Sequence, residues 1–72
     1  MTFGERLSML RKERGYTQKT FAQELDVSER CIRAYENGTR HPDFQGLIAL
    51  ADYFDVSLDY LVGRSDHRAR VR

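Results

Sequence analysis

Residues 17–38 of the 72-residue chain read TQKTFAQELDVSERCIRAYENG, and this stretch constrains the fold more than any other. Thr17 and Ser28 are residue types that cap helix N-termini, and the apolar residues after each recur at the spacing of one helical face. Gly38 is free to adopt the left-handed backbone that ends many helices. The stretch therefore predicts two short helices, the first ending near Asp26, joined by a tight turn.

The turn between these helices occurs twice in the chain. Residues 25–28 read LDVS and residues 54–57 read FDVS. In each copy an Asp, which tolerates the left-handed region better than most residues, follows the end of a helix, and a Ser caps the next one. We expect the Val between them to be buried against the flanking helices. The repeat predicts two rigid corners between helices.

Three further helices are predicted, one before this stretch and two after it. Thr2 and Glu5 form a capping box for the first helix, Asp43 caps a fourth, and Ser57 caps a short fifth that closes at Gly63. The residues expected to face the core in these helices are Phe3, Leu7, Leu10, Phe44, Leu47, Leu50, Ala51, Phe54, Leu58 and Leu61. The predicted fold class is all-α, a bundle of five helices that forms one domain over residues 1–63.

The composition excludes several classes of protein. Seventy-two residues with 40% hydrophobic content close one core and no second one. A single cysteine, Cys31, gives no disulfide framework, and with two distant histidines it gives no set of metal ligands. The sequence has no Gly-rich phosphate loop and no apolar run of the roughly 18 residues that span a membrane. We expect a cytoplasmic protein that is not an enzyme and uses no cofactor or metal.

The net charge of +1 hides an uneven distribution along the chain. Residues 43–63 hold four Asp and no Lys or Arg, whereas residues 64–72 hold four Arg and one Asp. The first forty-two residues are mildly positive. We expect residues 43–63 to face away from any phosphate backbone, and residues 64–72 to form a basic, flexible tail that either contacts phosphate or balances the charge without contacts.

Polar and basic side chains occupy the outward face of the helix that starts after Ser28. This face carries Glu29, Arg30 and Arg33. Arg can donate two hydrogen bonds to guanine and Glu can accept one from cytosine, whereas Ser28 and the helix N-terminus suit a phosphate. The pattern is typical of a helix-turn-helix that reads DNA. A solvated helix face is the alternative, and for Glu29 the alternative is an ion pair with Arg33.

The spacing of residues across this stretch resembles that of one known family. The residues that carry the resemblance are Thr17-Gln18-(x)3-Ala22-(x)2-Leu25-x-Val27-Ser28-(x)3-Ile32-(x)2-Tyr35-Glu36-Asn37-Gly38. They are similar to the lambda-repressor-like helix-turn-helix family, also called Xre or Cro, and the similarity covers about residues 3–63. It implies a five-helix bundle whose second and third helices form the motif, and a transcriptional regulator that binds operators as a homodimer.

The resemblance also implies roles for particular residues, in addition to base contacts by the three side chains on the outward face. Gln18 would contact a phosphate and support the recognition helix. Asn37 and Arg40 would hold the phosphate strand. Arg11 and Glu36 match positions that form a partly buried ion pair between the first and third helices.

Two functions remain open from the sequence. The first is a sequence-specific repressor of prophage or mobile-element type that binds a palindromic operator in double-stranded DNA, with residues 28–38 in the major groove. The second is a protein-interaction module on the same fold, such as the antitoxin of a toxin–antitoxin pair. In that case the acidic residues 43–63 would bind a basic protein such as a toxin, or an anti-repressor.

Overall fold

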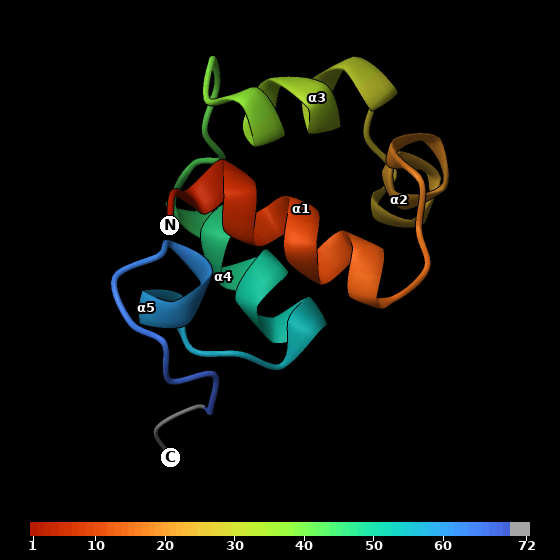
Figure 1. Ribbon diagram of the computed structural model, residues 1–72. Coiled ribbons are helices and arrows are strands. Elements are labelled where there is room, and N and C mark those ends of the chain that lie inside the picture. Colours follow the sequence, from red (N-terminus) through yellow and green to blue (C-terminus); the bar gives the residue numbers. More distant parts are fainter. Residues whose placement is uncertain (70–72) are drawn as a thin grey trace.

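The computed structural model describes residues 1–69, and these fold into five α-helices without a strand. The helices are α1 (Phe3–Glu13), α2 (Gln18–Leu25), α3 (Glu29–Asn37), α4 (Phe44–Phe54) and α5 (Leu58–Leu61). The predicted all-α fold class is confirmed. In Figure 1, α3 lies above α1, whereas α4 and α5 lie below it. Within the described residues, no helix has the length and apolar character needed to cross a membrane.

The helix starts are built from side-chain caps, as the sequence predicts. Thr2 Oγ1 accepts a hydrogen bond from the Glu5 backbone N–H at 3.1 Å, and the Glu5 carboxylate accepts one from the Thr2 backbone N–H at 2.9 Å. These hydrogen bonds from Thr2, the backbone one first, lower the pKa of Glu5. Asp43 caps α4 through the backbone N–H of Gly46 at 2.8 Å. Local capping therefore sets these boundaries.

Both predicted corners are present with nearly the same backbone. Asp26 ends α2 with φ 58° and ψ 44°, and Asp55 ends α4 with φ 55° and ψ 48°. Ser28 and Ser57 each accept a hydrogen bond from the backbone N–H three residues later, at 3.0 Å in both cases. At each of these two corners, only three residues separate one helix from the next.

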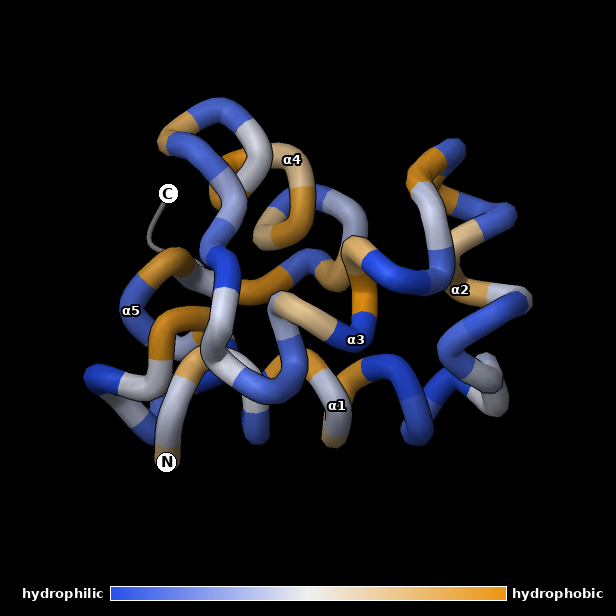
Figure 2. The backbone as a smooth tube through the Cα atoms, turned by 90° about the horizontal axis from the view of Figure 1, so that it is seen from above, coloured by the Kyte–Doolittle hydropathy of each residue, from blue (hydrophilic) through white to orange (hydrophobic). Residues whose placement is uncertain are grey.

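The core forms where all five helices meet. Seen from above α3 in Figure 2, α1 and α4 lie on opposite sides of it, with α2 at one end of the molecule and α5 at the other. Phe21 of α2 is fully buried, and its ring centroid lies 5.6 Å from that of Phe54 and 6.1 Å from that of Tyr53. The other fully buried side chains are Leu7, Ile32, Val56 and Leu61.

Three residues predicted to face the core are instead exposed. Phe44 is 71% exposed, Val27 40% and Leu58 39%, so the prediction was wrong for each. Phe44 lies in the first turn of α4, one turn before Ile48, which is also exposed. This side of α4 has no described helix packed over it, because α4 packs mainly on α5. Leu47 is half-buried against the core.

Two arginines of α1, Arg6 and Arg11, are buried. Arg6 is 3% exposed, and its guanidinium carbon lies 3.7 Å from the ring centroid of Tyr60. Its Nε donates to Met1 Sδ at 3.0 Å. Such stacking on an aromatic face stabilises a cation away from water. Arg11, the second buried arginine, belongs to the candidate site.

Residues 64–69 lie against α1 and the start of α5. The backbone N–H of Ser57 donates to the carbonyl of Arg68 at 3.1 Å, and Arg68 forms an ion pair with Glu13 at 2.6 Å. Asp66 lies 3.5 Å from the guanidinium of Arg6. The flexibility of the basic tail stays a prediction, and its residues Arg70 and Arg72 lie outside the described residues.

Candidate DNA-binding surface

The position of α3 follows from the corner that precedes it. After Asp26 turns the chain, Ser28 caps α3 by accepting from the Cys31 backbone N–H. Ile32 is fully buried and Cys31 is 9% exposed, so the inner face of α3 is fixed to the bundle. The first backbone N–H groups of any helix have no carbonyl partner within it, and in α3 the Ser28 side chain accepts from the one at Cys31.

The outward face of α3 carries the three side chains expected to face DNA bases. Arg30 is exposed, and the side chains of Glu29 and Arg33 are 43% and 53% exposed. Arg33 Nη1 lies 3.2 Å from Glu29 Oε2 and donates a hydrogen bond to it. The structure therefore brings Glu29 and Arg33 together in an ion pair across one helical turn. No ion pair of Arg30 occurs within residues 1–69.

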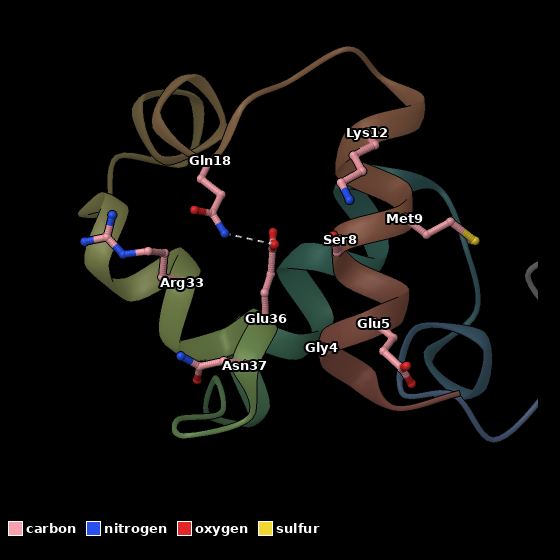
Figure 3. Close-up of a pocket in the computed structure, with 9 residues that line it drawn as sticks. All are labelled: Gly4, Glu5, Ser8, Met9, Lys12, Gln18, Arg33, Glu36 and Asn37. Atoms are coloured by element: carbon pink, nitrogen blue, oxygen red, sulfur yellow. Dashed lines mark hydrogen bonds between the residues drawn. The ribbon is translucent and has the colours of Figure 1, made fainter.

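A buried polar network fixes α3 to α1 and α2. Arg11 Nε lies 2.7 Å from Glu36 Oε2, and the two side chains are 8% and 9% exposed. Gln18 Nε2 donates to the other oxygen, Oε1, at 3.1 Å, and the two side chains point toward each other in Figure 3. Arg11 also donates to the carbonyl of Tyr16 at 2.8 Å. Arg11 thus makes two hydrogen bonds to the Glu36 carboxylate, through Nε and through Nη2. Such a bidentate pair is directional, so this network orients the three helices.

The start of the loop after α3 is held by hydrogen bonds. Gly38 ends the helix with φ 84°, a conformation that suits glycine. Asn37 Oδ1 accepts from the backbone N–H of Thr39 at 3.0 Å and from its hydroxyl at 2.7 Å. Asn37 and Arg40 are exposed at this end of α3. Ser28 lies at the opposite end of the same helix, so the predicted phosphate contacts bracket the predicted base contacts.

A groove between α1 and α3 contains residues that the sequence did not single out. Its lining consists of Gly4, Glu5, Ser8, Met9, Lys12, Gln18, Arg33, Glu36 and Asn37. In Figure 3, Lys12 extends from α1 toward the groove. The i, i+4 spacing of Ser8 and Lys12 places them on one side of α1, but a solvated helix face shows the same spacing. The sequence alone therefore gives no signal for Lys12.

Gly4 is the second residue that was missed, and its role is steric. A Cβ at this position would collide with the backbone carbonyl of Glu36, so the glycine allows α1 and α3 to approach closely. An isolated glycine inside a helical pattern is a usable signal of such an approach.

The model of one protein family, described as helix-turn-helix, matches residues 7–61 of this sequence. The chain belongs to the helix-turn-helix family. This confirms the lambda-repressor-like, or Xre/Cro, resemblance.

Individual family members support the assignment. The chain is 38% identical over 66 residues to the HTH-type transcriptional regulator ImmR of Bacillus subtilis, covering 92% of this chain and 52% of that protein. It is 36% identical over 64 residues to the cryptic phage CTXphi transcriptional repressor RstR of Vibrio cholerae, covering 89% and 57%. The chain thus spans about half the length of these helix-turn-helix relatives.

A solved helix-turn-helix structure has the same fold. The crystal structure of a transcriptional regulator from Listeria innocua superposes with a TM-score of 0.79 at 41% identity, covering 92% of this chain and 62% of that one. At this identity and coverage, the arrangement of all five helices is shared rather than the motif alone.

Proposed function

We propose that the chain is a sequence-specific, DNA-binding transcriptional repressor of prophage type, active in the cytoplasm. The observation that carries the proposal is the exposed Arg30 and Arg33 face of α3, supported from behind by the buried ion pair of Arg11 with Glu36. Arginine is the side chain that most often recognises guanine in the major groove. A phage repressor and a prophage-derived regulator are among the similar proteins, as is one transcriptional activator, and the two phage proteins support the prophage type.

In the proposed complex, α3 lies in the major groove, which is wide enough for a helix. Ser28 lies at the start of α3, Asn37 and Arg40 lie at its far end, and Gln18 lines the groove beside Arg33 and Glu36. In the complex these four residues would contact phosphates. Such phosphate contacts fix the register of a protein on DNA but carry no sequence information. Two copies, related by a two-fold axis, would bind a palindromic operator.

Selection of duplexes from a randomised pool, followed by titration at several salt concentrations, tests this function. We expect an enriched palindrome with half-sites about one helical turn apart, and an affinity that falls steeply with salt. An affinity that does not change with salt, together with no enriched sequence, would contradict the proposal.

Arg30→Ala and Arg40→Ala separate the two kinds of contact. Arg30→Ala should weaken binding to the selected duplex by about 1–3 kcal/mol and relax the preference at one base pair. Arg40→Ala should weaken binding to all duplexes alike, because a phosphate contact does not depend on the base. Equilibrium titrations with selected and scrambled duplexes measure both effects. A uniform loss for Arg30→Ala would move this residue to the phosphate-contacting group.

A second candidate function, a protein-interaction module of antitoxin type, is favoured by the exposed apolar side chains of the acidic segment. Phe44, Ile48 and Leu58 are exposed in a segment that holds four Asp and no basic residue. Co-expression with the product of a neighbouring reading frame tests it. A complex that forms with the parent chain and is lost with Phe44→Ala or Leu58→Ala would support this function, and a complex insensitive to both would oppose it.

A further inference from the structure

Glu29 is an unusual residue on a surface proposed to face DNA. Its carboxylate lies in the first turn of α3, among the side chains that would approach the bases, and it is 43% exposed. A carboxylate repels the phosphate backbone, and at these separations salt only partly screens the repulsion. Because the backbone N–H groups at the same helix end attract anions, Glu29 opposes the most general source of DNA affinity on this helix.

Glu29 also occupies the arginine that would otherwise be free to bind DNA. Arg33 Nη1 donates to Glu29 Oε2 at 3.2 Å, so Arg33 can direct all of its N–H donors to DNA only when the ion pair opens. Arg33 has no comparable alternative at Glu36, which lines the same groove, because that carboxylate already accepts from Arg11 and Gln18. The surface pair therefore competes directly with DNA for Arg33.

Only certain base pairs can compensate both members when the pair opens. Guanine O6 and N7 accept two hydrogen bonds from an arginine, and cytosine N4 donates one to a carboxylate. Phosphate and thymine O4 can accept a hydrogen bond from Arg33. Neither can donate one to the Glu29 carboxylate, which would then lie next to acceptors without a partner. A site that offers guanine to Arg33 and cytosine to Glu29 satisfies both side chains.

We propose that Glu29 is a specificity-determining residue of α3, which holds Arg33 in the free chain and releases it to DNA that presents guanine and cytosine together. The proposal rests on the DNA-binding function proposed above. It assigns Glu29 two effects, weaker binding to arbitrary DNA and a preference for a G·C pair in each half-site. Both effects come from the same carboxylate, so both disappear when it is neutralised.

The experiment compares duplexes selected from a randomised pool by the parent chain, by Glu29→Gln and by Arg33→Ala. Dissociation constants for the parent-selected duplex and for a scrambled duplex are then measured with each protein. We expect Glu29→Gln to bind the scrambled duplex severalfold more tightly and to lose about tenfold discrimination at one G·C position. Arg33→Ala should lose preference at the same position or at its neighbour, without the gain on scrambled DNA.

Glu24→Gln is the matched control, because it removes the same charge from an exposed residue of α2 that lines a different groove, with Val27 and Ala49. It should select the same sequence as the parent chain. The inference is overturned if Glu29→Gln keeps the selected base pair and its discrimination, or if Glu24→Gln reproduces the effect of Glu29→Gln. If the parent chain selects no sequence at all, the DNA-binding function fails with it, so the two failures are distinguishable.

Discussion

Residues 25–28 and residues 54–57 form the same corner in different surroundings. The Val27 backbone N–H donates to the Ala22 carbonyl, and the Val56 N–H to the Ala51 carbonyl, both at 3.0 Å. Yet Val27 is 40% exposed and Val56 is 1% exposed. Local sequence therefore determines the path of the backbone through each corner, and the helices packed around it determine whether its apolar side chain is buried.

The difference follows from what lies next to each corner. The corner at 54–57 joins α4 to α5, and Ser57 is also hydrogen-bonded to residues 67 and 68. The corner at 25–28 lies at the end of the molecule occupied by α2 and leads into the exposed face of α3 (Figure 1). The corner at 54–57 is therefore part of the core, whereas the corner at 25–28 lies at the molecular surface.

Val56→Ala is expected to give the largest difference between the corners. Removing two methyl groups from a fully buried side chain loses their burial and leaves a cavity, which should reduce the free energy of unfolding by about 2–3 kcal/mol. Urea unfolding followed by circular dichroism measures the loss. Val27→Ala is the matched control and should change stability by less than about 0.5 kcal/mol, because much of its side chain is already in water. Equal losses at the two positions would show that the corners are buried alike in solution.

The same distinction explains how much of the fold the sequence could predict. Caps and left-handed residues depend on a few neighbouring residues, and Thr2, Asp43 and Ser57 begin their helices where expected. The burial of Phe44 and Leu58 was predicted wrongly, because helical spacing identifies an apolar side chain without showing which helix packs on it.

For the candidate site, the sequence placed side chains on a face without showing their contacts. The pattern indicated Arg30 and Arg33 as outward residues, and both are exposed. Lys12 could not be found, because it reaches the groove from α1 only after α1 and α3 have packed. For Glu29 the structure shows the ion pair with Arg33, which the sequence indicated only as an alternative, and the base contact stays a prediction.

Tyr53 links α4 to the segment between α1 and α2, and we expect this link to weaken at high pH. Burial, and then a hydrogen bond from its hydroxyl to that of Tyr16 at 2.8 Å, raise the pKa of Tyr53 from 10.0 to about 12. A tyrosine is neutral below its pKa, so this contribution to stability is complete below pH 10 and is lost as the pH rises through 12. The loss should stay below about 2 kcal/mol, because solvent screens part of the effect. Urea unfolding between pH 9 and about pH 12 measures it.

Tyr53→Phe controls for the other groups that titrate in this range. It removes the ionisable hydroxyl and keeps the ring packed against Phe21 and Phe54. The variant should be less stable than the parent chain at neutral pH, because the Tyr16 hydroxyl loses its partner. Its stability should then fall less between pH 10 and 12. Parallel pH profiles for the two proteins would mean that Tyr53 does not titrate in the way its burial indicates.

The serines of the two corners give the smallest and most nearly equal effects. Ser28 and Ser57 each cap a helix through one hydrogen bond at 3.0 Å, so replacement by Ala should reduce the free energy of unfolding by about 1 kcal/mol at each. Ser57 also donates from its hydroxyl to the carbonyl of His67 at 3.2 Å, which should make its loss larger by about 0.5 kcal/mol. Truncation after Gly63 removes that carbonyl, so in the shortened chain the two substitutions should have equal effects in urea unfolding. If Ser57→Ala remains the more damaging after truncation, its excess comes from the packing around the second corner and not from residues 64–69.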